Sequence, residues 1–326
     1  LQYVILPTKV TKDSFDPDTT IVDGENNTSV KVTQCPDYDL GGCQIYENFY
    51  YDKKSKNKVR ALSDVTLTIP EGFFFGIIGH TGSGKSTFIQ HIDALIPVQG
   101  KLVVGEYDLS RGKKTDKKKL KELRSKTGIV FQYPEYQLFA ETVYQDVAFG
   151  FKNFNKDATE EEVKTAVYGA LSLVGLGEEL ANKSPFELSG GQKRRGAIAG
   201  VIVSKPEILI LDEPVAGLDP VGKRELMSLL HALHEHYVKT VVIVSHDMDE
   251  VAENCTDVAV FSEGKIVMTG TPREVFSRAD ELTALRLDVP ITAKLTAALK
   301  EAGVDIDSDF TTDDFVSKVA EIYKKA

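Results

Sequence analysis

The stretch that decides the fold is Gly79-His80-Thr81-Gly82-Ser83-Gly84-Lys85-Ser86-Thr87, which directly follows the apolar run Phe73–Ile78. It has the pattern G-x-x-x-x-G-K-[S/T], whose closely spaced glycines let backbone N–H groups wrap around a polyphosphate. The next residues, up to Ile92, can open a helix whose N-terminal dipole favours the same anion. The pattern therefore predicts strand, phosphate-binding loop and helix, with Lys85 reaching the terminal phosphates and the Ser86 hydroxyl ligating Mg²⁺.

The composition of the chain excludes several classes of protein that could carry such a loop. The chain has 326 residues and a net charge of −10, so it is large enough for one or two domains, and its charge argues against bulk nucleic-acid binding. No apolar run approaches the ~20 residues of a membrane-spanning helix, and the N-terminus lacks the basic region of a signal peptide. Three cysteines favour a reducing compartment, and we expect Cys35 and Cys43 to be unpaired thiols.

The sequence before the P-loop predicts mostly β structure. Residues 1–43 hold turn-forming clusters around short β-type runs and no motif, so we treat them as an N-terminal extension of open role. Period-2 alternation over Ala61–Ile69 predicts a strand, and the charged segment Asp52–Lys58 a hairpin turn before it. Residues 113–126 carry eight Lys or Arg; we expect the solvated face of a short helix, with anionic lipid or nucleic acid as the alternative.

The rest of the chain changes its periodicity twice. The spacing of apolar residues over Glu160–Val174 predicts a helix that Gly175 ends. From residue 201 to 270, β-type runs alternate with helical ones, which is typical of a parallel sheet with crossover helices. After Pro290, a small helical tail reaches Ala326.

Two carboxylates follow a wholly apolar run. The run Ile208–Leu211 ends in Asp212 and Glu213. Asp212 suits an outer ligand of the Mg²⁺ that Ser86 would hold, while Glu213 points elsewhere and suits a general base that polarises water. Adjacent acids also occur as helix caps or surface residues, but here they close a buried strand of a P-loop protein.

The most specific signal is Leu188-Ser189-Gly190-Gly191-Gln192, followed by Lys193-Arg194-Arg195. It places a hydroxyl and glycine N–H groups at the start of a helix, which is a second anion-binding terminus on a chain with one P-loop. The stretch resembles the signature motif of ATP-binding cassette (ABC) ATPases. In that family the motif closes over the γ-phosphate of ATP held by the partner's P-loop, so the resemblance implies that Ser189, Gly190, Gly191 and Gln192 bind nucleotide across a head-to-tail dimer.

The other family motifs fall in order. Gln132 matches the Q-loop glutamine, which touches Mg²⁺ and the attacking water; Asp219 lies in the D-loop; and His246 matches the switch histidine that contacts the γ-phosphate. Tyr51 stands where the family stacks an aromatic ring on adenine, with Tyr50 as competitor and simple packing as the alternative. The resemblance thus implies ATP and Mg²⁺ as cofactors, with Ser86, Gln132 and Asp212 at the metal and Glu213, His246, Gln132 and Lys85 as the catalytic set.

The resemblance also implies the architecture. We expect an α/β P-loop NTPase fold with a RecA-like parallel-sheet core, an antiparallel β subdomain, an α-helical signature subdomain and a small C-terminal helical extension. The expected boundaries are an extension over 1–43, an ABC domain over 44–280 with the helical part at about 133–190, and the C-terminal part over 281–326. Two positions depart from the family pattern: Val215 stands where Thr is common, and Gly196 replaces a usual aliphatic residue, which weakens the helix by up to ~1 kcal/mol.

The residues around and after the Q-loop glutamine indicate which type of ABC protein the chain resembles. The segment Phe131–Phe139, with its aromatic residues, is similar to the corresponding segment of energy-coupling factor (ECF) transporter ATPases. These transporters have two ATPase paralogues, and the segment resembles that of the second. These side chains suit a groove for a coupling helix, with core packing as the alternative. The tail from Leu287 resembles the extension that those ATPases use in dimer contacts.

The resemblance implies a function and partners. We expect an ATP-hydrolysing subunit of an ECF importer for vitamins or other micronutrients, peripheral on the cytoplasmic face of the cell membrane. Its expected partners are a second, non-identical ATPase, a transmembrane coupling subunit and substrate-binding membrane proteins, with no nucleic acid. The alternatives are another ABC importer, for metal ions or amino acids, and a soluble ABC ATPase. A soluble ribosome-acting ATPase would usually have two cassettes, and a chromosome-type ATPase needs a long coiled coil between Gln132 and Leu188 that this chain has no room for.

Overall fold

A computed structural model of the chain describes residues 20–22, 29–31, 42–51, 59–98, 100–110 and 117–325, with side chains for 60–98, 100–110 and 117–324. The expectations for Cys35, for the side chains of Cys43, Tyr50 and Tyr51, and for the turn at Asp52–Lys58 lie outside the described residues.

The apolar run before the phosphate loop forms a buried strand in the middle of the main sheet. Each of its residues, Phe74–Gly79 (β5), is shielded from solvent. β11, β5, β10, β9 and β8 run parallel, and β12 pairs antiparallel with β11 at one edge. In spatial order the six strands are β12 (Lys265–Gly270), β11 (Asp257–Ser262), β5, β10 (Thr240–Val244), β9 (Ile208–Asp212) and β8 (Thr127–Val130). The predicted parallel-sheet core is therefore confirmed.

The two faces of this sheet belong to two hydrophobic cores, because successive side chains of a strand point to opposite sides. In β9, Leu209 and Leu211 enter the core that includes the helices between residues 143 and 276, whereas Ile208 and Ile210 enter the core that includes the helices at residues 85–92 and 117–126 and the strand at residues 59–70. A strand buried on both faces reads as a continuous apolar run, which is why the sequence signal was strong.

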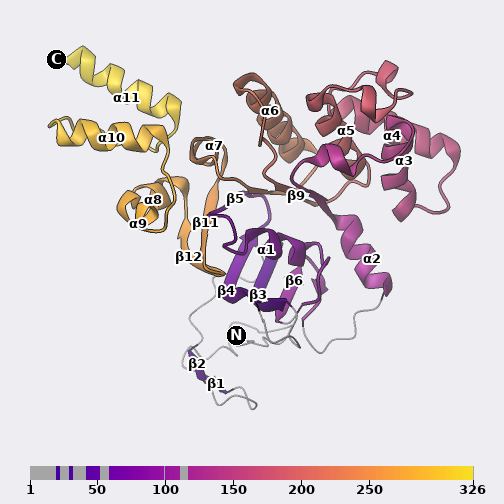
Figure 1. Cartoon of the computed structure of the whole chain (residues 1–326), viewed down its shortest axis with the longest axis horizontal. Helices are drawn as coiled ribbons and strands as arrows, with labels where there is room; N and C mark the ends of the chain where they lie inside the picture. Colours follow the sequence, from indigo (N-terminus) through magenta and orange to yellow (C-terminus); the bar gives the residue numbers. More distant parts are fainter. Residues whose placement is uncertain are drawn as a thin grey trace.

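The second sheet is antiparallel and lies against the first across α1 (Figure 1). Its strands, in spatial order, are β4 (Val59–Pro70), β3 (Gly42–Tyr51), β6 (Lys101–Val104) and β7 (Tyr107–Asp108). A separate pair, β1 (Thr20–Val22) and β2 (Ser29–Lys31), is also antiparallel.

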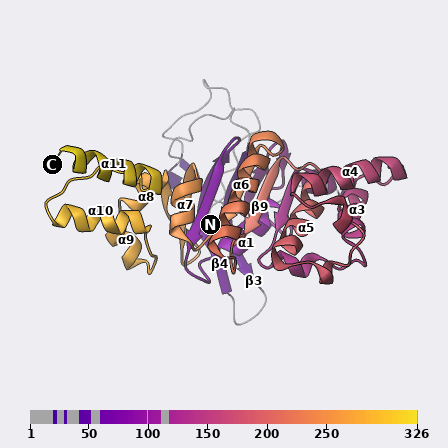
Figure 2. The same ribbon diagram turned by 90° about the horizontal axis from the view of Figure 1, so that it is seen from above.

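The helices divide the molecule into a middle and two ends. α3, α4 and α5 gather at one end, the last helices form the other, and the main sheet lies between them (Figures 1 and 2). Capping boxes fix the starts of α3 and α4 at Thr142 and Thr159. From the P-loop to the last crossover the helices are α1 (Lys85–Ile92), α2 (Lys117–Lys126), α3 (Val143–Phe154), α4 (Glu160–Leu173), α5 (Gly190–Ile202), α6 (Pro220–His236) and α7 (Met248–Asn254), with 3₁₀ turns η2 (Pro134–Gln137), η3 (Glu178–Leu180) and η4 (Pro185–Glu187).

The C-terminal part is helical, as predicted from the sequence after Pro290. Phe276 and Leu282 enter the core beneath the main sheet, which anchors this part to the rest. Its helices are α8 (Pro272–Phe276), α9 (Ala279–Ala284), α10 (Ile291–Glu301) and α11 (Thr312–Lys325).

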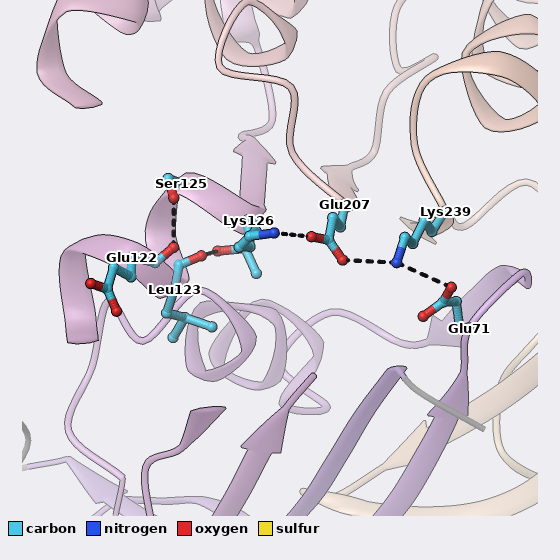
Figure 3. Close-up of polar contacts among 8 residues, drawn as sticks. Glu71, Glu122, Leu123, Ser125, Lys126, Glu207 and Lys239 are labelled. Atoms are coloured by element: carbon cyan, nitrogen blue, oxygen red, sulfur yellow. Dashed lines mark hydrogen bonds and ion pairs between the residues drawn. The ribbon is translucent and has the colours of Figure 1, made fainter. Parts of the chain in front are cut away.

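A chain of charges joins the amino ends of the parallel strands, opposite the P-loop. Glu207, before β9, binds both Lys126, before β8, and Lys239, before β10 (Figure 3). Lys239 also reaches Glu71, at 3.3 Å between Nζ and Oε1. These groups are partly exposed, so solvent screens their attraction and each pair contributes little to stability.

Candidate functional site

The P-loop curls between β5 and α1 around the Lys85 side chain. Its Nζ donates to the carbonyl oxygens of Gly79, at 2.6 Å, and His80, at 3.0 Å. Gly84 caps α1 with φ of 105°, and a Cβ there would lie 2.6 Å from the carbonyl oxygen of Ala61. Glycine is therefore required at residue 84, both by the left-handed backbone and by the close approach of β4.

The loop contains a buried hydroxyl without a partner among the described residues. Ser83 is fully buried, and its Oγ makes no hydrogen bond. Leaving a buried polar atom unsatisfied costs about 1–3 kcal/mol, so each such atom needs an explanation, and a bound polar group is one. This observation fits the phosphate group that the motif predicts.

Oxygen donors for a cation stand beside the loop. Asp212, at the end of β9, accepts a hydrogen bond from the Ser86 side chain; burial raises the pKa of the Asp212 carboxyl, and that bond opposes the rise. Burial also lowers the pKa of Lys85, while Glu213 and Asp212 act to raise it. A hydroxyl and a carboxylate are the hard oxygen ligands that Mg²⁺ prefers, and phosphate oxygens usually complete its shell. No cluster of three or more His, Cys, Asp or Glu that could hold a metal occurs among the described residues.

Glu213 is the centre of a polar triad. Gln132 Nε2 donates to its Oε2 at 2.6 Å, and His246 Nδ1 lies 3.4 Å from its Oε1. The backbone of Glu213 is left-handed, with φ of 48°, and its N–H donates to the Val244 carbonyl at 2.8 Å. This turn follows the end of β9 at Asp212. A non-glycine residue in this conformation is strained by about 1–3 kcal/mol, as is common at functional sites.

The P-loop, the carboxylates and the triad line one cleft of about 660 Å³. It has room for a nucleotide-sized ligand. Its lining comprises Arg60, Ala61, Gly79, His80, Thr81, Gly82, Gly84, Lys85, Ser86, Thr87, Gln132, Asp212, Glu213 and His246. The cleft thus gathers the predicted residues from the ends of β5, β8, β9 and β10.

The signature residues and the D-loop aspartate lie elsewhere. Ser189 caps α5: its Oγ accepts from the Gln192 N–H at 3.3 Å, and its own N–H donates to Gln192 Oε1 at 2.9 Å. Gly190 and Gly191 form the exposed first turn of α5. Asp219 caps α6 by accepting from the Gly222 N–H at 2.7 Å. Within one chain, none of these residues lines the cleft.

Two cleft-lining residues were missed by sequence reasoning. Arg60 and Ala61 come from β4, the strand of the second sheet that faces the P-loop. Neither belongs to a motif, and only the packing of one sheet against the other brings them here. The predicted adenine contact at Tyr51 lies outside the described side chains.

Comparison with known proteins shows the family to which the chain belongs. The family model described as "ABC transporter" matches residues 62–216. A protein of Caldanaerobacter subterraneus subsp. tengcongensis named energy-coupling factor transporter ATP-binding protein EcfA2 is 48% identical over 267 residues, covering 81% of this chain and 91% of that protein. A protein of the same name from Clostridium tetani is 46% identical over 264 residues, covering 80% and 90%.

Solved structures show the same fold. The chain is similar to cbiO1 from Clostridium perfringens, described as part of the ABC transporter complex cbiONQ, with a TM-score of 0.65, 35% identity, and coverage of 79% of this chain and all of that one (100%). It is also similar to an ATP-binding cassette in a dimeric post-hydrolysis state bound to ADP and Pi, with a TM-score of 0.63, 29% identity, and coverage of 71% and 98%.

Proposed function

The chain belongs to the ABC transporter family, as an ATPase subunit of the energy-coupling factor type, and on that premise we propose which residues bind ATP, hydrolyse it and receive the partners. The observation that carries the proposal is the cleft in which Lys85 and the Glu213 carboxylate line the same space. The nucleotide phosphates lie along the P-loop, from Gly79 to Thr87. Its N–H groups and Lys85 bind them, and Ser83 gains a partner.

The oxygen donors beside the P-loop fit Mg²⁺. Ser86 and Asp212 would hold the ion, with Gln132 at the edge of its shell. When bound, such an ion neutralises charge on the phosphate oxygens. The Asp212 carboxyl is ready for this role because the Ser86 hydroxyl already orients it.

Glu213 acts on the water. Its carboxylate accepts from Gln132 and faces His246, so the attacking water would be oriented by groups that are already fixed in place. His246, with about two thirds of its side chain exposed, would contact the γ-phosphate. Positioning and electrostatics carry phosphoryl transfer of this kind, since the protein forms no covalent bond to the phosphate.

The signature residues Ser189–Gln192 and Asp219 serve the nucleotide of a second ATPase. They lie at exposed helix starts outside this chain's own cleft, where helix N-termini attract anions. The dimeric cassette bound to ADP and Pi supports this arrangement. The adenine ring of this chain's own ATP stacks on Tyr51, or on Tyr50 in its place.

Two exposed apolar surfaces suit the partners. The coupling surface is made of Tyr133, Tyr136, Phe139 and Phe149, whose exposed fractions run from 45% to 85% and whose rings contact one another in two pairs; Phe186, 78% exposed, is a further candidate. It lies after the Q-loop glutamine and receives the transmembrane coupling subunit. At the other end of the molecule, Ile291, Leu295, Val316, Val319 and Tyr323 are exposed on α10 and α11, and we assign this surface to the second ATPase.

The importer carries vitamins or other micronutrients, which separate membrane proteins bind, and the ATPase lies on the cytoplasmic face of the membrane. The names of the relatives favour this type over a metal-ion or amino-acid importer. Among the described helices, none combines the length and the apolarity that crossing a bilayer requires. Affinity purification of the tagged chain from native membranes tests the partners: a second ATPase, a shared membrane subunit and small substrate-binding proteins support the assignment, and a conventional permease alone contradicts it.

Glu213→Gln tests the catalytic assignment. Because the amide cannot take a proton from water, we expect ATP binding to persist while hydrolysis falls by about 10²–10⁴-fold. Nucleotide binding by equilibrium titration and phosphate release measure the two effects. Glu235→Gln, an exposed change on α6, is the matched control and should leave both unchanged. Near-normal phosphate release from Glu213→Gln would remove Glu213 from the role of base.

A further inference from the structure

The switch loop, residues Ser245–Asp247 between β10 and α7, is held on two sides by side chains that the catalytic assignment does not use. We propose that Glu250 and Lys223 are positioning residues that clamp this loop and so fix His246 against Glu213. This inference rests on the roles proposed above for His246 and Glu213. Neither Glu250 nor Lys223 lines the cleft, so both act through the loop.

Glu250, on α7, holds the switch loop through the Ser245 side chain. Ser245 Oγ donates to Glu250 Oε2 at 3.1 Å, and both residues are buried, with exposed fractions of 1% and 8%. The same hydroxyl accepts from the Asp247 N–H at 3.1 Å. The Glu250 carboxylate therefore orients a serine hydroxyl that in turn fixes the backbone on the far side of His246.

Lys223, on α6, holds the switch loop through the Asp247 carboxylate. Its Nζ lies 2.6 Å from Asp247 Oδ2, while Asp247 Oδ1 accepts from the Glu250 N–H at 3.2 Å and caps α7. Lys223 belongs to the first turn of α6, whose cap is Asp219. The ion pair thus joins the helix that follows the D-loop to the loop that carries the switch histidine.

The charges around Glu250 make the clamp sensitive to pH. Burial raises the pKa of Glu250 to about 7 and the Asp247 carboxylate adds to the rise, while the Ser245 hydroxyl and the Lys223 ammonium oppose it. The buried Cys255 thiol, at the end of α7, also faces this charge. An ionised acceptor makes a hydrogen bond roughly twice as strong as a neutral one, so the clamp tightens as pH rises through 7.

Rigid support is needed because His246 itself is mostly exposed. The loop is otherwise attached to the sheet by the Ser245 N–H, which donates to the Ile77 carbonyl at 3.2 Å. A displacement of about 1 Å can cost up to 10²-fold in rate when a group must meet a transition state, whereas binding of the ground state changes little. Loss of the clamp should therefore appear in kcat and leave KM for ATP nearly unchanged.

The test is steady-state ATP hydrolysis by the assembled transporter containing the full chain, from pH 6 to 8.5. We expect Ser245→Ala and Lys223→Met each to lower kcat about tenfold with KM changed less than about twofold. Lys223→Arg should restore most of the rate. For Glu250→Gln, the loss relative to wild type should grow above pH 7, and the double variant with Ser245→Ala should be no slower than Ser245→Ala alone. Glu253→Gln, on the same helix but bonded to the Thr312 N–H, is the matched control.

Three results separate the possible failures. Full activity of the Ser245, Lys223 and Glu250 variants, alongside an inactive Glu213→Gln, would overturn the clamp and leave the proposed catalytic function standing. Normal hydrolysis by Glu213→Gln would instead overturn the assignment on which the clamp rests. A rate loss with unchanged pH profile, accompanied by a lower melting temperature in every variant including Lys223→Arg, would reduce the network to a structural role and contradict the proposal.

Discussion

Two buried ionisable side chains near the P-loop helix show how single residues respond to the fold. His91 is fully buried, and burial lowers its pKa to about 4, while its contact with the Thr87 carbonyl, 2.8 Å from Nδ1, acts in the opposite direction. Asp93 is buried beside it and accepts from Thr127; burial raises its pKa to about 6. In both residues burial thus favours the neutral form, because the core beneath the P-loop solvates charge poorly.

The sign of each shift determines how stability depends on pH. The folded-state pKa of His91 lies below its unfolded value of 6.5, so between pH 6.5 and 4 the unfolded chain binds more protons and unfolding becomes easier as pH falls. The folded-state pKa values of Asp93 and Glu250 lie above their unfolded values, so these residues contribute the opposite slope, with stability lost as pH rises through about 6 and 7. Because these slopes have opposite signs, the pH dependence of the whole protein's unfolding free energy does not show the contribution of any single residue. That contribution is measured by comparing the wild type with a variant that lacks the residue.

We predict that His91→Asn removes the histidine's part of this dependence. Between pH 7.5 and 5 the wild type should lose about 2 kcal/mol relative to the variant, because Asn does not titrate. Chemical denaturation of both proteins at the two pH values gives the four free energies of unfolding. Whatever the fixed cost of the smaller side chain, it cancels in the difference. Equal differences at pH 7.5 and 5 would show that His91 is not held neutral by the fold.

At the scale of elements, the signature helix α5 fits against α3 at two glycines that differ in kind. A Cβ on Gly150 of α3 would lie 2.1 Å from the Gly200 carbonyl oxygen, so the two helix backbones touch there. A Cβ on Gly196 of α5 would meet its nearest neighbour, Leu138, at 3.9 Å, which is ordinary contact. The glycine at residue 196 is therefore not required by packing, and the expectation that it weakens the helix stays a prediction.

The pair makes a matched test of helix packing. Gly196→Ala should raise the free energy of unfolding by about 0.5–1 kcal/mol, because alanine restricts the unfolded backbone and fills open space. Gly150→Ala should lower it by about 1–3 kcal/mol, because the helices must separate. Thermal unfolding of both variants distinguishes the cases. A stabilised Gly150→Ala would mean that α3 and α5 do not touch as closely as described.

At the scale of the whole molecule, β5 and α1, which carry the cleft-lining P-loop, lie in the middle, while α3 and the pair α10 and α11, which carry exposed apolar residues, lie at opposite ends (Figure 2). Phe139 and Phe149 stack edge to face with ring centroids 5.0 Å apart, although each is more than half exposed. Exposed aromatic groups of this size usually mark an interaction site. On the proposed function, a partner bound here would contact the segment that follows Gln132, and we expect its movement to change the position of Gln132 beside Glu213.

We predict that Tyr136→Ser combined with Phe139→Ser releases the transmembrane partner. Both side chains are mostly exposed and lose only their ring contacts with Tyr133 and Phe149, so the melting temperature should fall by no more than a few degrees, while recovery of the membrane subunit in affinity purification should fall about tenfold or more. Tyr237→Ser, half-exposed after α6, is the matched control and should retain the partner. Undiminished recovery with the double variant would place the membrane contact elsewhere.

The sequence by itself determined the chemistry and the class of fold. The P-loop and the strand ending at Asp212 and Glu213 are local patterns: each needs neighbouring residues in one conformation, and apolar runs with helical or alternating periods specify those conformations directly. The tertiary structure decided which of these patterns meet. β5 lies between β10 and β11 in the sheet, although about 165 residues separate β5 from β10 in the chain. This strand order brings Gln132, Glu213 and His246 into the same cleft as Lys85. The clamp of Lys223 and Glu250 on the switch loop and the approach of Arg60 to the cleft depend on packing between elements, for which no local pattern exists.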